Sequence, residues 1–567
     1  MPDQGIRARW VEWLPWLGYS VSLLARESEQ CQGIPNLTRH HRLRGPWLAV
    51  MAAVVASPAS GGDRLAQVER LLSGDAPAKE RSGIASSGPF DAQTVVNMAR
   101  TLAKSPFVPP ETSLPDALAK LQYDQYRDIR FRPSATIWAQ PGRRFRLQTL
   151  PLGYLFTTPV EIAIVKDGKA QHLAYRADMF TAGKLVPEPL PTQDVGFSGF
   201  RLLYPINDRR RFDEVAVFQG ASYFRSVGRD QAYGLSARGL ALKVGDPAGE
   251  EFPIFRAFWI EEPQGRSATV VLHALLDSPS VAAAYRFEIR PGRDTAMVVQ
   301  AVLFPRVDLK EVGLAPETSM FMFSPNGRNG VDDFRPQVHD SDGLLVFNGR
   351  GEHLWRPLAN PARLQINAFE DEKPRGFGLV QRDRNVADYQ DFESHFERRP
   401  SLWVDPEGDW GEGDVVLTEI PSDAEIHDNI VAFWRPREPI RGGSEFRLSY
   451  RLSWGDEPGA ARDFLRVQAT ALGRADVKAP TPVRRFVIDY SRGPFQCSTP
   501  CPLPQATVTT SAGKVQDVVV SDNPLPFGYR VTFTLDPEKT DLCELRLELK
   551  FDDSRRAEVW LYRWTKP

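Results

Sequence analysis

Short segments in which apolar and polar residues alternate recur along the chain from about residue 129. Turn residues close each segment, and alternation with a period of two is typical of antiparallel strands that bury one face. No fixed-period repeat accompanies them, which argues against a propeller or a solenoid. The clearest examples are Arg144–Leu150, Glu161–Val165, Glu214–Phe218, Ala268–Leu272 and Thr295–Val302.

Helical patterns cluster in the region before these strands. A helix is predicted over Ala92–Lys104, because Asp91 can accept hydrogen bonds from its first free amides and Phe90 can pack on Val95. A second, short helix is predicted from about residue 113 to about residue 123. The fold class is therefore mainly all-β with a few short helices.

A polar segment rich in small residues, Trp454–Ala461, divides the chain. We predict a large N-terminal β-sandwich domain over residues 64–455, a linker over 456–468 and a C-terminal Ig-like β-sandwich over 469–567. Five strands are expected in the last part: Arg485–Tyr490, Gln505–Thr510, Tyr529–Leu535, Cys543–Phe551 and Ala557–Trp564.

Composition narrows the classes of function. The 70 basic and 72 acidic residues leave a net charge of −2, so nucleic acid is not the expected partner, since a phosphate-binding surface usually shows a basic excess. The 42 glycines, 47 prolines and 32 phenylalanines suit many strands joined by tight turns. No apolar run of about 18 residues is present, which excludes a polytopic membrane protein.

Residues 1–60 are predicted to be an N-terminal extension and a signal peptide. Basic residues at 40–44, an apolar stretch at 47–56 and small residues at 57–60 follow the order of a secretory signal. A buried helix is the alternative. Because this pattern begins about forty residues in, we expect the true start to lie downstream of Met1.

Cysteines and motifs give no reason to expect a metal or another cofactor. Cleavage would leave Cys497, Cys501 and Cys543, which allow at most one disulfide, and their spacing is a poor zinc signature. The chain lacks GxSxG, HExxH and P-loop motifs. Asp340 and Asp342 superficially resemble a calcium loop but lack its later oxygen donors.

Carboxylates, arginines and aromatic residues are unusually dense between about residues 320 and 435. Aromatic faces and charged groups hold sugars, and glycoside cleavage adds a pair of carboxylates, so this composition fits a carbohydrate groove. Solvated loops are the alternative. The clusters are Asp332–Pro336, His339–Gly343, Trp355–Pro357, Tyr389–Asp391, Arg398–Trp403, Gly408–Gly411 and Ile426–Asn429.

Asp428 is the carboxylate that the local pattern singles out. In an extended segment it would share a face with Ile430, Ala432 and Trp434, and an apolar neighbourhood raises a carboxyl pKa, as a general acid requires. Local sequence alone nevertheless favours a turn-forming role at the start of a strand. The same holds more strongly for Asp340.

Many longer motifs make a family resemblance specific over roughly residues 88 to 567. The chain resembles the periplasmic glucan biosynthesis proteins OpgG and OpgD, also called MdoG and MdoD. The motifs that carry the resemblance are Phe212–Arg225, Tyr233–Leu240, Glu251–Pro253, Phe258–Trp259, Thr318–Met320, Asp333–Pro336, Val338–Gly343, Leu354–Pro357, Pro374–Gly378 and Arg399–Trp403.

The resemblance implies a large β-sandwich with a long cleft, joined to an Ig-like domain, and action on β-1,2-linked glucan in the periplasm. Characterised members look like inverting endo-β-1,2-glucanases. The family's general acid matches Asp428, and the carboxylate that starts proton removal from the attacking water matches Asp340. These roles come from the resemblance alone and reverse what local sequence favours.

Six further residues are candidates for binding the sugar, although each also fits a core aromatic or a structural ion pair. They are Trp355, Arg356, Tyr389, Arg399, Trp403 and Trp434. Ile426 and His427 depart from the small polar residues common in relatives, and His427 could shift the pKa of Asp428. The signal region has no Arg-Arg pair, which favours Sec export and the G type, although Tyr389–Asp391 and Arg399–Trp403 lean towards the D type.

Three functions stay open on the sequence. The first is an inverting endo-β-1,2-glucanase that trims or releases the periplasmic glucan. The second is a non-catalytic factor that binds nascent glucan and presents it to other enzymes. The third is a transglycosylase that cyclises the glucan. In each case the expected partners are β-1,2-glucan and the inner-membrane glucosyltransferase that makes it.

Overall fold

The fold was analysed in a computed structural model that describes residues 83–112, 114–328, 330–457, 464–478, 481–491, 502–524, 528–552 and 555–566. The predicted extension and signal peptide over residues 1–60 lie outside the described residues, as do Cys497 and Cys501. Among the described helices, none combines the length and apolar character needed to cross a bilayer.

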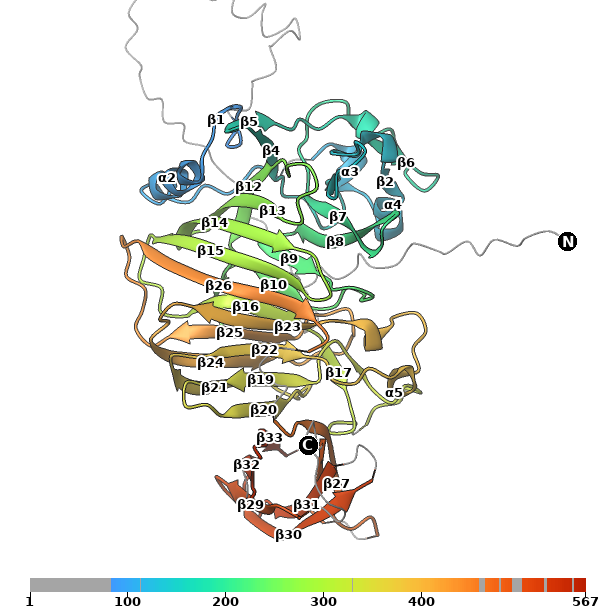
Figure 1. Ribbon diagram of the computed structural model, residues 1–567, viewed down its shortest axis with the longest axis vertical. Coiled ribbons are helices and arrows are strands. Elements are labelled where there is room, and N and C mark those ends of the chain that lie inside the picture. Colours follow the sequence, from blue (N-terminus) through green and yellow to red (C-terminus); the bar gives the residue numbers. More distant parts are fainter. Residues whose placement is uncertain are drawn as a thin grey trace, which may run out of the picture.

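Two large sheets face each other and form the main body (Figure 1). The prediction of a mainly all-β sandwich fold is confirmed. The 15-stranded sheet has the spatial order β1 (Gly88–Pro89), β5 (Lys169–His172), β4 (Glu161–Lys166), β12 (Ile254–Glu261), β13 (Val270–Asp277), β14 (Val281–Arg290), β15 (Thr295–Pro305), β26 (Phe446–Gly455), β23 (Ser401–Glu407), β22 (Gly376–Val380), β19 (Gly343–Phe347), β20 (His353–Pro357), β33 (Val559–Thr565), β32 (Leu542–Lys550) and β29 (Gln505–Thr510).

The second sheet has ten strands, and neighbouring strands in it are antiparallel. Aromatic rings fill the space between the two sheets: Phe218 of the second sheet meets Phe258 of the first edge to face at 5.5 Å, and Phe287 of the first at 5.3 Å. The order is β21 (Gln365–Glu372), β24 (Glu412–Glu419), β25 (Ile430–Pro436), β16 (Val312–Ser319), β10 (Ser236–Arg238), β9 (Tyr223–Ser226), β8 (Arg211–Gln219), β7 (Gly199–Asp208) and β3 (Arg146–Leu150), with β11 (Ala241–Leu242) beside β16.

Short elements close the rims of the main body. Two small two-stranded sheets pair β17 (Phe321–Phe323) with β18 (Val338–His339), and β2 (Ile129–Phe131) with β6 (Phe180–Ala182). The described helical elements are α2 (Ala92–Leu102), α3 (Asp116–Ala119), α4 (Tyr123–Arg127), α5 (Val386–Tyr389), η1 (Pro133–Ala135), η2 (Ala177–Met179) and η3 (Phe396–Arg398).

The first predicted helix is confirmed as α2. Asp91 accepts the Thr94 amide at 2.8 Å, Thr94 accepts the Asp91 amide in return, and Phe90 and Val95 are buried in one cluster on the outer face of β12–β15. Of the second predicted helix, from about residue 113 to about residue 123, only the short α3 forms, and α4 begins at Tyr123, where the predicted helix ends.

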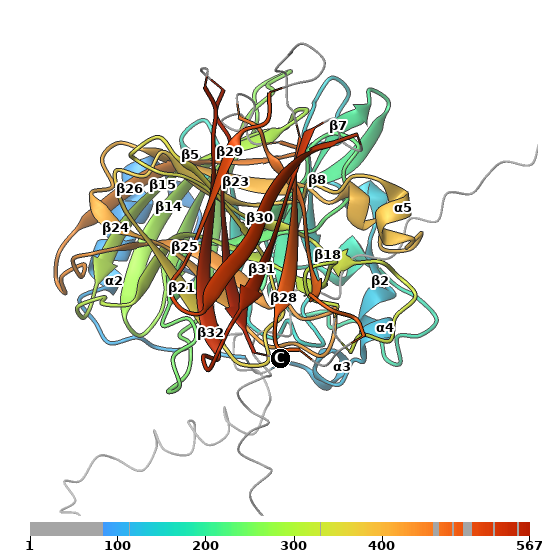
Figure 2. The ribbon, with the colours of Figure 1, turned by 90° about the horizontal axis from the view of Figure 1, so that it is seen from below.

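The C-terminal strands form a smaller body at the lower end of the molecule (Figures 1 and 2). Four of them make a separate sheet, and β29, β32 and β33 continue the 15-stranded sheet, since β33 pairs in parallel with β20. Phe486 of β28 packs on Phe533 of β31 at 4.9 Å and on Trp560 of β33 at 5.9 Å. The separate sheet has the order β27 (Val467–Arg474), β28 (Arg484–Ser491), β31 (Gly528–Asp536) and β30 (Lys514–Asn523).

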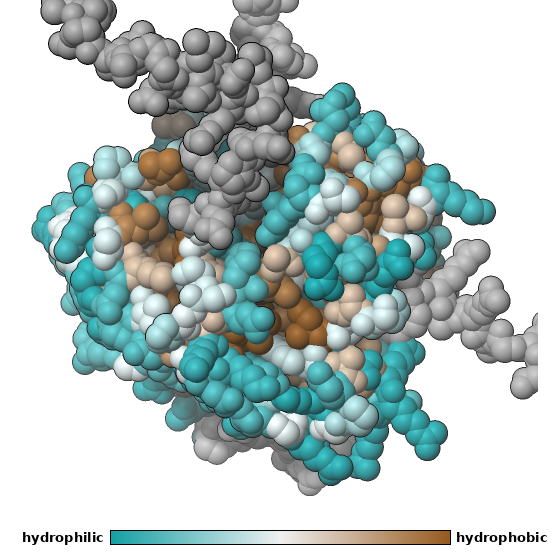
Figure 3. Space-filling model, turned by 90° about the horizontal axis from the view of Figure 1, so that it is seen from above, coloured by the Kyte–Doolittle hydropathy of each residue, from teal (hydrophilic) through white to brown (hydrophobic). Residues whose placement is uncertain are grey.

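The bounds of the predicted domains, and the Ig-like label of the second one, stay predictions. Strand β26 ends at Gly455, and β27 begins at Val467, inside the predicted linker. The end of the molecule opposite these strands is largely hydrophilic, with apolar residues gathered in patches (Figure 3). The apolar side chains that hold the two bodies together lie in one buried cluster, where Trp355 and Trp403 of the main body pack with Phe486 and Trp560 of the C-terminal strands.

Candidate functional site

The short strand β17 brings distant segments of the chain together. Its residue Phe321 pairs with His339 of β18, and the Asp340 amide donates to the Met320 carbonyl at 2.8 Å. On the other side, the Asn429 side chain accepts the Phe321 amide at 2.8 Å. Asp340 and Asp428 are next to these contacts in the sequence, so β17 sets the position of both.

Asn429 fixes the backbone that carries Asp428. Besides accepting the Phe321 amide, its side-chain nitrogen donates to the carbonyls of Phe321 at 3.0 Å and Ile420 at 3.1 Å. Asn429 is itself buried, and its two hydrogen bonds with Phe321 form away from water. The turn before β25 is thereby tied to the strand that contacts Asp340.

The Asp428 side chain is 3 % exposed and faces arginines. Its Oδ2 lies 3.5 Å from Arg225 Nη2, and Arg225 Nε donates to Ser236 Oγ at 2.6 Å. Burial raises the pKa of Asp428 from its ordinary value, against the lowering effect of Arg225, Arg238 and Arg399. Ile430, Ala432 and Trp434, which were predicted to share a face with Asp428, are buried in the core. The Asp428 carboxyl therefore lies among arginines as well as beside an apolar face.

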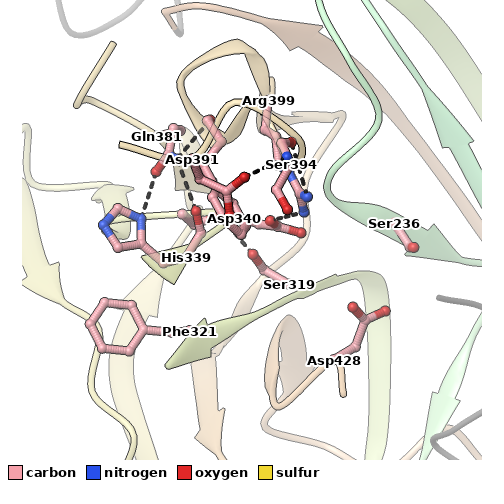
Figure 4. A network of polar contacts seen from close by, with 12 residues as sticks. Ser236, Ser319, Phe321, His339, Asp340, Gln381, Asp391, Ser394, Arg399 and Asp428 are labelled. Atoms are coloured by element: carbon pink, nitrogen blue, oxygen red, sulfur yellow. Dashed lines mark hydrogen bonds and ion pairs between the residues drawn. The ribbon is translucent and has the colours of Figure 1, made fainter. Parts of the chain in front are cut away.

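Asp340 is buried and paired with Arg399, whose Nη1 donates to Asp340 Oδ1. Arg399 lies over the Phe396 ring at 4.3 Å, and its Nη2 donates to the Ser394 carbonyl at 3.4 Å. Burial raises the pKa of Asp340 to about 6, the Arg399 charge lowers it, and the charge of Asp428 raises it again. The charges of the two carboxyls therefore act on each other, and Figure 4 shows Asp428 in the same region as the Asp340–Arg399 pair.

Loops from three parts of the chain meet beside this pair at Arg335. Its guanidinium lies 2.8 Å from Asp333, 2.9 Å from Asp391 and 2.8 Å from Glu425. Asp391 also accepts the amides of Glu393 and Ser394, in the turn that leads to Arg399. The density of charge that the sequence shows between residues 320 and 435 is thus in part a network that joins loops around Asp340 and Asp428.

Two of the predicted sugar-binding residues contact Asp340 or its neighbour His339. Arg399 is its ion-pair partner. Tyr389 is fully buried: its hydroxyl donates to the Asp383 carbonyl at 3.1 Å, and its ring meets His339 edge to face at 5.3 Å. Both side chains therefore support the segments that carry Asp340.

The other four predicted sugar-binding residues are buried in different places. Trp355 and Trp403 pack in the cluster that the main body shares with the C-terminal strands. Arg356 pairs with the buried Glu419 at 3.1 Å. Trp434 lies in the main core, 6.3 Å from Trp410. Sugar binding by these four stays a prediction, and the site built around Asp340 and Asp428 does not include them.

Sequence reasoning did not single out Arg225, Arg238 or Thr318. The two arginines are buried on β9 and β10, and Arg238 Nε donates to Thr318 Oγ1 at 3.0 Å. A buried arginine requires an acidic or polar partner, and this requirement is the only signal that the sequence gives for these residues. The partner, however, is distant in the sequence.

Within the described residues, one group of side chains has the spacing of metal ligands. Ligand atoms of His339, Asp342 and Asp383 all lie within 4.8 Å of one another. His339 directly precedes Asp340 in the sequence, and Asp342 lies two residues after it.

A family model described as "Periplasmic glucan biosynthesis protein, MdoG" matches residues 90–564. The chain belongs to this family. The resemblance predicted from the motifs is confirmed, and membership in the MdoG family ties the chain to glucan biosynthesis and is consistent with a periplasmic location.

Curated relatives agree with this assignment. The chain is 57% identical over 481 residues to "Glucans biosynthesis protein G" of Vibrio cholerae, which covers 85% of this chain and 88% of the relative. It is also 57% identical over 479 residues to "Glucans biosynthesis protein G 1" of Shewanella oneidensis, covering 84% and 88%. A solved structure, the Slr1438 protein of Synechocystis sp. PCC 6803, matches with 9% identity over 46% of this chain and 88% of that one, with a TM-score of 0.14.

Proposed function

We propose that this member of the MdoG family is an inverting endo-β-1,2-glucanase that trims or releases glucan in the periplasm. The observation that carries the proposal is the convergence of Asp340 and Asp428, both buried and each beside an arginine, on the two sides of β17. Two carboxyl groups in one site are what most glycoside hydrolases require. The linkage and the stereochemistry come from the family resemblance.

Asp428 acts as the general acid in this proposal. Burial favours its neutral form, so it can give a proton to the oxygen of the scissile glycosidic bond. Once the proton has left, the Arg225 guanidinium at 3.5 Å stabilises the carboxylate that remains. The leaving sugar departs as an alcohol, and after the reaction the proton that the base has accepted returns to Asp428 through the solvent.

Asp340 acts as the base. Its pKa of about 6, which the Arg399 charge keeps from rising further, leaves Asp340 an anion at neutral pH, and it accepts a proton from the attacking water through intervening water molecules. Attack by water on the face opposite the leaving group inverts the anomeric carbon. The inner-membrane glucosyltransferase would supply the glucan on which this reaction acts.

Hydrolysis of linear β-1,2-glucan by the purified mature chain tests the proposal. Reducing ends should accumulate with the wild type, and Asp428→Asn should lower the rate by about 100-fold or more. Asp414→Asn is the matched control, because Asp414 pairs with Arg435 away from the site at 3.0 Å and should keep the wild-type rate. Proton NMR of the first product should show the α-anomer.

Other results would favour the other two functions. Tight glucan binding without new reducing ends, unchanged in Asp428→Asn, would indicate a non-catalytic assembly factor. Cyclic glucan formed without new reducing ends would indicate a transglycosylase. Wild-type hydrolysis by Asp428→Asn would refute the role of Asp428.

A further inference from the structure

His339, Asp342 and Asp383 form a cluster behind Asp340. His339 ends β18, Asp342 precedes β19, and Asp383 follows β22. His339 Nε2 lies 3.4 Å from Asp342 Oδ1, and an oxygen of Asp383 lies within 4.8 Å of both. His339 points away from the Arg399 side of Asp340 (Figure 4), so this cluster is separate from the pair of carboxyls described above.

The hydrogen bonds of Gln381 determine which nitrogen of His339 carries the proton. The Gln381 side-chain nitrogen donates to the carbonyls of His339 and Phe396, each at 3.1 Å. Gln381 Oε1 must therefore accept, and its partner at 3.0 Å is His339 Nδ1. In the neutral imidazole, Nε2 then has a lone pair and no proton.

That lone pair has no hydrogen-bond partner, although His339 is fully buried. It faces carboxylate oxygens, which also offer lone pairs. Asp342 Oδ2 already accepts the amides of Arg382 and Asp383, and Asp383 Oδ2 accepts from Gln337 Nε2 at 2.8 Å. Three electron-pair donors thus converge on one point, and a cation placed there would satisfy all of them.

We propose that His339, Asp342 and Asp383 bind one divalent transition-metal ion of the Zn²⁺ or Mn²⁺ class. One imidazole and two carboxylates are ligands that such ions accept, whereas Ca²⁺ and Mg²⁺ prefer all-oxygen sets. The separation of 3.4 Å between His339 Nε2 and Asp342 Oδ1 suits two neighbouring ligands on one ion. Gln381 and Gln337 supply the outer hydrogen bonds that orient metal ligands in proteins.

The role of the ion is positional and does not depend on the proposed hydrolysis. It joins the β18–β19 connection to the segment after β22, and Asp340 lies between two of its ligands. The backbone on both sides of Asp340 is then held at fixed points, while the Asp340 carboxyl stays with Arg399.

Metal binding by the full mature chain tests this inference. Protein treated with a chelator and dialysed should take up one equivalent of Zn²⁺ or Mn²⁺, and the Tm should rise by several degrees. Ca²⁺ and Mg²⁺ should give no comparable rise. Co²⁺ should give a visible d–d absorption that reports nitrogen and oxygen ligands directly.

Two variants, each replacing a proposed ligand by a side chain of similar size, test which residues bind the ion. His339→Gln and Asp383→Asn should each weaken binding by about 100-fold or more and abolish the Co²⁺ absorption. His395→Gln is the matched control, since His395 Nδ1 contacts Glu397 at 3.0 Å outside the cluster, and it should bind like the wild type. No uptake by the wild type, or equal uptake by the two cluster variants, would overturn the proposal, and the wild-type result does not depend on whether a variant folds.

Discussion

Arg399 shows how a single residue can hold a charge inside this protein. It is 1 % exposed, and its partner Asp340 is equally buried. Moving two charges out of water is unfavourable, and their attraction offsets this only while both are present. Removal of one partner leaves the other as an unpaired charge in the interior.

Arg399→Met should therefore lower the free energy of unfolding by about 3–5 kcal/mol, measured in chemical denaturation. Adding Asp340→Asn to that variant should restore part of the loss, because the unpaired carboxylate is gone. Arg451→Met is the control: its pair with Asp405 is half exposed, and about 1 kcal/mol or less is expected. Equal losses in both single variants would contradict the buried-pair argument.

Among the elements, β16 contributes a side chain that crosses between the two large sheets. Glu317 of β16 is fully buried, and its Oε2 accepts the Leu379 amide of β22 at 2.7 Å. Burial raises the pKa of Glu317 well above its usual value. The native state therefore binds this proton more strongly than the unfolded chain does, so stability falls as pH rises above the unfolded pKa of about 4.3.

Glu317→Gln removes this pH dependence. The Tm of the variant minus that of the wild type should increase between about pH 5 and about pH 8, because only the wild type must keep a proton on a buried carboxyl. Thermal unfolding across that range measures the difference. A difference that stays constant with pH would show that Glu317 is not held neutral in the native state.

A variant of Asn429 tests whether β17 holds the Asp428 segment in place. Asn429→Ala should lower the free energy of unfolding by about 1–3 kcal/mol, since the buried Phe321 amide loses its acceptor. On the proposed function, kcat should fall as well, because Asp428 is the next residue. Asn348→Ala breaks contacts with Glu352 in another loop and should leave kcat unchanged; a lower kcat in both variants would argue against a specific role for β17.

Strand positions were predictable where alternation was clean, and less so elsewhere. Gln505–Thr510 coincides with β29, and Thr295–Val302 lies within β15. Strand β30 was missed, because most of Lys514–Asn523 is exposed and lacks a buried face. Strand β27 was missed where it begins inside the predicted linker.

The candidate site was harder to predict, because its contacts are long-range. Local sequence favoured a turn-forming role for Asp340 and Asp428, and only the family resemblance predicted a catalytic role for them. Arg225 lies about two hundred positions from Asp428, and no local pattern pairs them. Trp355 was a candidate for stacking on a sugar, yet the Arg382 guanidinium carbon lies 3.5 Å from its ring centre. The ring is buried in the core shared with the C-terminal strands.

At the scale of the whole molecule, Arg382 joins the main body to the C-terminal strands. Its guanidinium donates to both oxygens of Glu558, at 2.6 and 2.9 Å, and to the Val467 carbonyl. Glu558 is fully buried and also accepts the Val467 amide at 2.8 Å. The two bodies are thus joined by a buried ion pair as well as by strand pairing.

Arg382→Met should uncouple them. Hydrogen exchange should rise in β27–β33 before it rises in the main body, and stability should fall by about 3–5 kcal/mol. Arg546→Met is the matched control, because its ion pair with Glu352 also crosses between the bodies but is about one-third exposed, so the effect should be small. Uniform exchange changes across the whole chain in Arg382→Met would show that the bodies unfold as one unit.

The parallel pairing of β20 with β33 has a consequence for aggregation. A sheet edge offers unpaired amides and carbonyls to any passing strand, and β33 covers this edge of the main body through Leu354–Val559 and Trp355–Trp560. While β33 is not in place, as in a newly synthesised or truncated chain, β20 presents an edge with unpaired backbone groups and the apolar side chains of Leu354 and Trp355. The C-terminal strands therefore prevent the larger sheet from self-associating through this edge.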